Sequence, residues 1–201
     1  MFGFLTSVAF ATLLANATPE TCFLSLPFFI ALLYMKVHPV SAVAIFLLSF
    51  LIRFNFSIIL SGIIACVIAV AFFVLVRKKY KRIGGKVAIA STLCALPFAF
   101  FVKGNLTEIL VQCAFSVILT PVFISAIRVL YVKRLKFKSD EGERVCLLTL
   151  FVFLGLGFIT LFGFNAYRSV VIFLILFCIE AFGASTACVL AITLAIAPSI
   201  K

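Results

Sequence analysis

The 201 residues of the chain are 66% hydrophobic and 11% charged, with a formal net charge of +11. Soluble globular domains are about 45–50% apolar and about 25% charged, so a water-soluble fold would lack the polar side chains to cover its core. The composition excludes an ordinary soluble domain and predicts an integral membrane protein, whose apolar exterior faces lipid.

Apolar runs separated by short polar stretches predict the helical segments of the chain. The expected segments are residues 2–15, 22–35, 40–52, 56–76, 87–102, 106–131, 145–164 and 170–197. They indicate an all-α fold, a polytopic transmembrane bundle of about six to nine short helices. We expect one integral membrane domain over residues 1–201 and no soluble domain.

Several segments do not have the length of one straight membrane span, which is about 20 residues. Residues 22–35 and 40–52 are short, and this favours two tilted spans, with a re-entrant hairpin as the alternative. The run 170–197 is too long for one untilted span, so it either tilts strongly or breaks near residues 180–185.

Small side chains recur every four residues in segment 56–76, at Ser57, Ser61, Ala65 and Ala69. Such a stripe lets two helix backbones approach closely in a membrane, so we expect this face to pack against another segment. The alternative is chance in an alanine-rich helix.

Cations are concentrated in two connectors, and a charge at the bilayer centre costs roughly 2.5–3.5 kcal/mol, so both connectors must lie outside the hydrocarbon. The first connector holds Arg77, Lys78, Lys79, Lys81, Arg82 and Lys86, and the second holds Lys133, Arg134, Lys136 and Lys138. If both are cytoplasmic and each segment spans once, fourteen Lys and Arg residues lie inside and three outside. This asymmetry follows the positive-inside rule and places the N-terminus in the cytoplasm.

The two connectors are also the expected surfaces for cytoplasmic protein partners or for anionic lipid. They lack the interleaved aromatic residues or recognised fold of a nucleic-acid-binding element, so no nucleic-acid partner is expected.

Glu180 is the one carboxylate deep in an apolar run, which makes it a candidate intramembrane polar site. One hypothesis makes it a proton or ion ligand. The other makes it a neutral packing residue or a residue at a helix break near the interface.

The sequence offers no constellation for catalysis. Its seven cysteines form no Cys-x-x-Cys pair and it has a single histidine, His38, which argues against a disulfide framework or a zinc site. Because phosphate loops and nucleophile–base sets are also missing, we expect neither an enzyme nor a cofactor, and any small-molecule ligand is unknown.

The order of several features is similar to a known membrane region. The features are Gly3-Phe4-Leu5, Leu26-Pro27-Phe28-Phe29, Thr107-Glu108-Ile109-Leu110, Leu119-Thr120-Pro121, the basic exit 131–138, the acidic stretch 139–143 and the glycine-containing run 145–164. In this order and spacing the chain resembles the N-terminal membrane region of the stage II sporulation protein E family, without the soluble phosphatase domain.

The resemblance implies a membrane anchor in the bacterial cytoplasmic membrane. It would localise a sporulation regulator to the cell-division septum, self-associate there and bind septal or cytoplasmic proteins. No phosphatase residue is carried over, because nothing in this sequence corresponds to the phosphatase domain.

A second class of function fits the size of the chain. About two hundred residues in short helices is also the size of small vitamin-transporter substrate-binding subunits. Such a subunit, or another small transporter, requires an outward-facing cavity with polar or aromatic groups.

Overall fold

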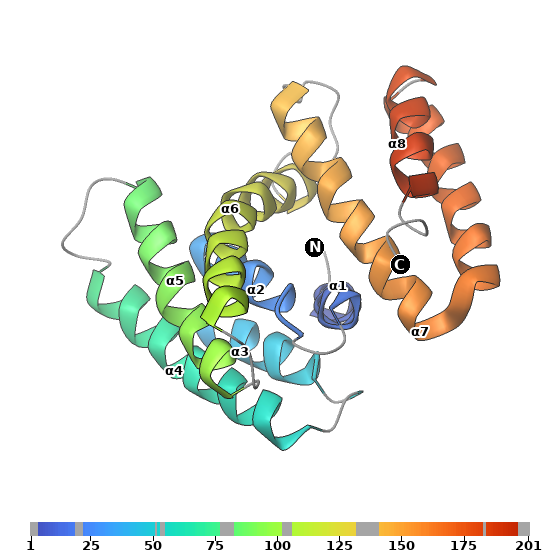
Figure 1. The fold of residues 1–201 in the computed structure, drawn as a ribbon. Helices are drawn as coiled ribbons and strands as arrows, with labels where there is room; N and C mark the ends of the chain where they lie inside the picture. The colour runs from blue at the N-terminus through green and yellow to red at the C-terminus, as the bar shows by residue number, and fades with distance from the viewer. Residues whose placement is uncertain are drawn as a thin grey trace.

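The computed structural model describes residues 4–18, 22–50, 52, 55–76, 83–101, 106–131, 141–182 and 184–196. The elements within these ranges are all helices (Figure 1). They are α1 (Phe4–Ala17), α2 (Ser25–Tyr34), α3 (Pro39–Leu48), α4 (Phe56–Val76), α5 (Ile83–Phe101), α6 (Leu106–Tyr131), α7 (Glu141–Phe182) and α8 (Ala184–Ile196). The all-α expectation is confirmed for the described part of the chain.

Helix α2 forms the centre of the main core. Its residues from Ser25 to Leu33 are all buried, and it packs against α1, α3, α5 and α6. A helix that is apolar on every side has no face for water and suits either a protein core or lipid, and the structure places α2 in the core.

The turn between α2 and α3 is specified locally. Lys36 adopts a left-handed conformation with φ of 61°, its N–H donates to the Leu33 carbonyl, and the Val37 N–H donates to the Leu32 carbonyl. This is a Schellman C-cap with lysine where glycine is usual. Pro39 then starts α3 at a position where its missing N–H has no cost.

Stacked phenylalanine rings join α2, α3 and α5. The ring centroids of Phe29 and Phe46 are 4.6 Å apart in a stacked pair, and Phe50 meets Phe46 edge to face at 4.8 Å. Phe98 of α5 closes the cluster, with its ring 6.1 Å from Phe50. Such geometries add about 0.5–1.5 kcal/mol per pair to the burial of the rings.

Helix α4 packs on α5 through the small-residue stripe that the sequence predicts. Ser61, Ala65 and Ala69 are fully buried, Ser57 is half-buried, and the Cys94 thiol of α5 donates to the Ala65 carbonyl at 3.7 Å. The expectation of close packing along this face is confirmed.

Hydroxyl groups join α5 to α6 in the same layer. The Ser91 hydroxyl donates to Thr120 Oγ1 at 2.8 Å, and the Ser116 hydroxyl donates to the Ser91 carbonyl at 3.5 Å. All three side chains are fully buried, so these hydrogen bonds lie between helices and away from solvent.

The first half of α7, residues 141–162, crosses α1 at Gly157. A Cβ atom at this position would overlap the carbonyl of Leu13. Only glycine permits this contact between the two backbones, so the crossing depends on this residue.

Helix α7 reverses direction at Gly163, and α8 runs back beside it (Figure 1). Gly163 has φ of 82° and ψ of 174°, a combination open essentially to glycine alone. The run expected over 170–197 is divided between the second half of α7, residues 164–182, and α8. We call residues 164–182 together with α8 the C-terminal hairpin, and α1 to α6 with the first half of α7 the main body.

Among the described residues, three helices are long and apolar enough to cross a membrane on the basis of length and composition: Phe56–Val74, Leu110–Leu130 and Glu141–Leu176, which includes the bend. Helices α2 and α3 have 10 residues each. Ten residues rise about 15 Å, half the roughly 30 Å thickness of the hydrocarbon core.

Candidate functional site: an apolar surface with charged ends

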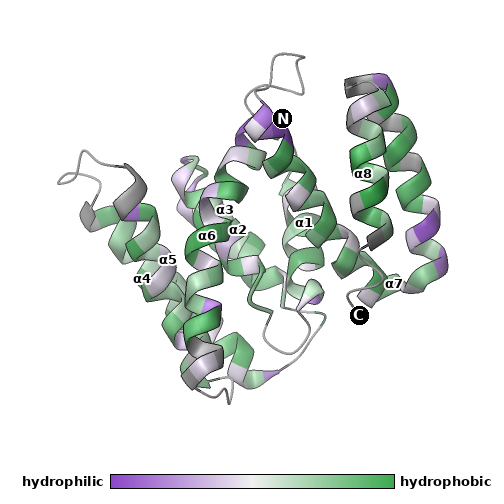
Figure 2. Ribbon diagram, turned by 45° about the horizontal axis from the view of Figure 1, so that its top comes forward, coloured by the Kyte–Doolittle hydropathy of each residue, from purple (hydrophilic) through white to green (hydrophobic). Residues whose placement is uncertain are grey.

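The outward faces of the long helices are apolar. Exposed large side chains include Phe56, Val67 and Val74 on α4, Leu110, Phe115 and Ile118 on α6, and Ile172 and Leu176 on the second half of α7. In Figure 2 hydrophobic colour predominates along the helical ribbons, and the hydrophilic colour is confined to short stretches. Soluble monomers rarely expose contiguous apolar patches larger than a few hundred Å², so this surface indicates a lipid or protein contact.

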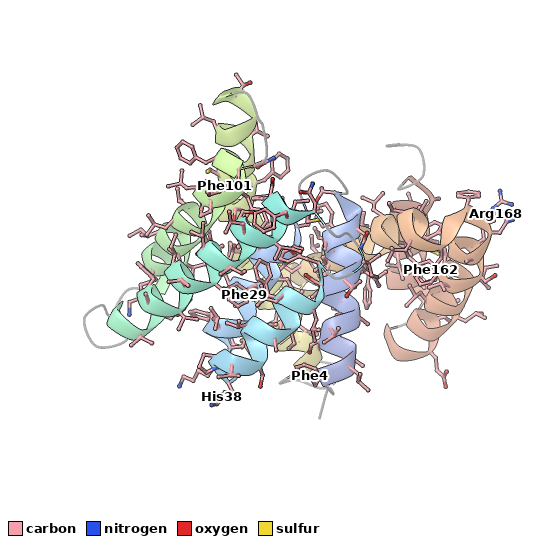
Figure 3. The ribbon with its side chains drawn as sticks, turned by 90° about the horizontal axis from the view of Figure 1, so that it is seen from below. Phe4, Phe29, His38, Phe101, Phe162 and Arg168 are labelled. Atoms are coloured by element: carbon pink, nitrogen blue, oxygen red, sulfur yellow. The ribbon has the colours of Figure 1, made fainter. Side chains whose placement is uncertain are left out.

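Charged side chains lie at helix ends. Arg128 is exposed in the last turn of α6, and Glu141 and Glu143 are in the first turn of α7. Each sign suits the dipole of its helix end, as the sequence predicts for the two glutamates. Figure 3 shows His38 and Phe4 at one edge of the molecule, where the exposed α2–α3 turn also places Lys36.

Most of the two basic connectors lies outside the described residues. These positions are Arg77, Lys78, Lys79, Lys81, Arg82, Lys133, Arg134, Lys136 and Lys138. The described member, Lys86, is half-buried in the first part of α5. The expectation that α5 begins at residue 87 is wrong by four residues, because the helix begins at Ile83 and includes Lys86.

Glu180 lies in the last turn of α7 and is exposed. Glu180 is in the middle of an apolar run of the sequence, but it is not in the middle of a helix, because α7 ends two residues later at Phe182. This arrangement favours the hypothesis of a residue beside a helix break over that of an enclosed ion ligand.

Arg168 marks the opposite end of the same half-helix. Its guanidinium carbon lies 4.6 Å from the centroid of the Phe164 ring, a cation–π contact, and the side chain points outward from α7 (Figure 3). A cation stacked on an aromatic ring beside Gly163 is typical of a membrane interface, where aromatic and basic residues act as anchors.

Tyr167 joins the two helices of the C-terminal hairpin, and this role was not predicted from the sequence. Its hydroxyl donates to the Leu194 carbonyl at 2.7 Å, which is one of the last carbonyls of α8 and has no partner within the helix. The ring packs on Gly155, where a Cβ atom would come within 3.0 Å of it. A glycine twelve residues before a tyrosine is the only signal in the sequence, and it is a weak one.

An open groove of about 550 Å³ lies between α4 and α5. It is lined by Ile64, Ile68, Leu93, Leu96, Pro97, Phe100 and Phe101. Binding sites for polar small molecules place a few polar groups in an apolar pocket to orient the ligand, and this lining contributes only apolar side chains.

Potential metal ligands are dispersed over the structure. Within the described ranges no three His, Cys, Asp or Glu side chains come together. The cysteines described are free thiols, and Cys22, Cys66 and Cys94 are buried in the helical core. Their surroundings give them the role of small apolar packing residues.

Comparison of the chain with protein-family models, with curated proteins and with solved structures finds no match. The resemblance to the sporulation family therefore rests on the order and spacing of sequence features alone.

Proposed function

We propose that the protein is a multi-span anchor of the bacterial cytoplasmic membrane, with its N-terminus and both basic connectors in the cytoplasm. The observation that carries the proposal is the distribution of polarity. Apolar side chains cover the outward faces of α4, α6 and α7, whereas charged groups lie at helix ends and in connectors. Lipid satisfies such a surface, and water does not.

The short helices are compatible with this proposal because of where they lie. A lipid-facing helix must match the hydrocarbon thickness, but α2 is buried on all sides and contacts other helices instead. Its backbone groups are satisfied within the helix and its caps, which is the condition for polypeptide at membrane depth.

The anchor is proposed to place a regulator at the division septum and to self-associate there, as the resemblance to the sporulation phosphatase family implies. In this proposal the six cations between Val76 and Val87 hold the orientation of the chain and face partners or anionic lipid.

The test replaces these six cations with serine and glutamine in a fluorescent fusion expressed in a sporulating bacterium. Loss of septal enrichment together with altered orientation is the expected result. The matched control replaces the three cations proposed to lie outside, Arg53, Lys103 and Arg168. Unchanged orientation and localisation of the first variant would refute the role given to the connector.

Thermal unfolding in the presence of a panel of vitamins distinguishes the anchor hypothesis from the transporter-subunit hypothesis. A ligand that binds only the native state raises its stability by mass action, so a tight ligand shifts the unfolding temperature of the purified protein. The anchor proposal expects no shift with any vitamin, and a concentration-dependent shift would contradict it.

A further inference from the structure

The C-terminal hairpin and the main body have separate hydrophobic clusters. The hairpin cluster is centred on Ala187, Leu190 and Leu194 of α8, whereas the main cluster is built from the body helices. The first half of α7 belongs to both. Leu147, Leu150 and Leu154 belong to the body cluster, and Leu148 and Val152 pack against the hairpin cluster. Phe151 packs against both clusters and so lies where the hairpin meets the body.

The contacts described between the hairpin and the first half of α7 are apolar, which matters in a bilayer. Lipid tails are as apolar as leucine, so no hydrophobic force drives two such surfaces together, and these apolar contacts contribute through packing. The body is held differently, by hydrogen bonds such as that from Ser91 to Thr120 and by the backbone contact at Gly157.

The hairpin is nevertheless tied together internally. The Tyr167 hydrogen bond to the Leu194 carbonyl joins its two helices near Gly163. The hairpin can therefore change its position relative to the body without losing its own contacts.

Gly163 provides the joint. A Cβ atom there would meet nothing within 4 Å, so packing does not require glycine at this position. The backbone requires it, because φ of 82° with ψ of 174° is strained for any other residue. Gly155 supplies the matching notch, since its missing side chain leaves room for the Tyr167 ring and Leu194.

We propose that Gly163 is a hinge about which the C-terminal hairpin docks on and swings away from the first half of α7 within the membrane, with Gly155 as the docking notch. This inference rests on the proposed membrane location. The swing exposes the face around Phe151 and Gly155 to lipid and moves α8 relative to the body.

The chain contains no tryptophan, so one introduced tryptophan is a clean reporter in proteoliposomes with brominated acyl chains, which quench tryptophan on contact. Phe151→Trp reports on the docked face. Val67→Trp, at an exposed position near the middle of the apolar stretch Phe56–Val74, reports on permanent lipid contact. Phe98→Trp, at a fully buried position of the body, reports that the body is intact.

Two glycine variants in the Phe151→Trp protein test the hinge. Gly155→Leu fills the notch, and Gly163→Ala strains the docked backbone, which we expect to lower the ratio of docked to undocked protein by about 5–30-fold. Both should raise quenching toward that of Val67→Trp, while Phe98→Trp stays shielded in the same variants. Gly142→Ala is the matched control, because Gly142 lies in the same helix with open space around it and no positive φ.

Three results would overturn the hinge. One is unchanged quenching in Gly155→Leu or in Gly163→Ala, which would make the hairpin a fixed part of the body. Another is a Phe151→Trp parent already quenched as fully as Val67→Trp, which would exclude the docked state. The third is quenching of Phe98→Trp in the glycine variants, which would show global unfolding instead of a swing. If Val67→Trp itself escapes quenching, the membrane location fails and the hinge fails with it.

Discussion

The main body and the C-terminal hairpin are built from equally apolar helices but are held together by different interactions. The body has buried hydrogen bonds between α5 and α6, a ring cluster between α2, α3 and α5, and a backbone contact between α1 and α7. The hairpin meets the body through apolar side chains around Gly155. In lipid, specific polar bonds and close backbone approach give the stable contacts, so the two regions should respond differently to mutation.

The largest expected effect is at the α1–α7 crossing of the body. Gly157→Ala forces a methyl group onto the Leu13 carbonyl, and we expect it to destabilise the protein by about 3 kcal/mol or more. The measurement is SDS-induced unfolding followed by far-ultraviolet circular dichroism. Gly142→Ala, the control in open space, should be neutral or slightly stabilising because alanine is the better helix former. Equal effects of the two variants would contradict the close crossing.

Truncation of one buried side chain in each region sharpens the comparison. Phe46→Ala removes the central ring of the body cluster and should cost about 3–5 kcal/mol, whereas Leu190→Ala in α8 should cost about 2 kcal/mol, the low end for such a change. The reason is that lipid tails or a shift of the hairpin can fill the space that the Leu190 side chain leaves. The same unfolding experiment measures both, and a larger loss for Leu190→Ala would invert the proposed ranking.

One hydroxyl in each region provides a finer comparison. Thr120→Val removes the acceptor of the Ser91 hydroxyl, and Tyr167→Phe removes the donor to Leu194. Interhelical hydrogen bonds in membrane proteins contribute about 0.6 kcal/mol on average and about 1.7 at most, so both losses should be small. Hydrogen exchange distinguishes them, because Thr120→Val should accelerate exchange in α5 and α6 and Tyr167→Phe only in α8. Spread of the Tyr167→Phe effect into α5 would contradict the separation of the regions.

An effect of similarly small size but of the opposite sign is expected at the α2–α3 turn. Lys36→Gly removes the backbone strain of a lysine in the left-handed conformation and should stabilise the protein by about 1 kcal/mol. Lys36→Ala keeps the strain while removing the same charge, so it should give no gain. If both variants stabilise equally, the charge and not the backbone is responsible.

Sequence reasoning predicted the helical class and the packing face of α4, because each depends on local pattern. Ser61, Ala65 and Ala69 show their common face by spacing alone. The hairpin contacts were not predictable in the same way. The Tyr167 hydroxyl meets Leu194 only after the chain reverses at Gly163 and breaks before α8.

Glu180 illustrates the same limit. Its apolar neighbours in sequence suggested a group deep in the membrane, but the break after Phe182 places it in the last turn of a helix. The depth of a polar residue depends on where helices end, and the sequence left open whether the run 170–197 breaks near residues 180–185 or continues as one tilted helix.

Orientation of the connectors in the membrane tests the central claim most directly. Reporter fusions that are active on only one side of a bacterial cytoplasmic membrane would be placed after Lys81, Gly104 and Lys138. The account predicts cytoplasmic signals after Lys81 and Lys138 and the opposite signal after Gly104, with the protein retained in the membrane after alkaline extraction. Release by alkali, or the same signal at all three positions, would contradict it.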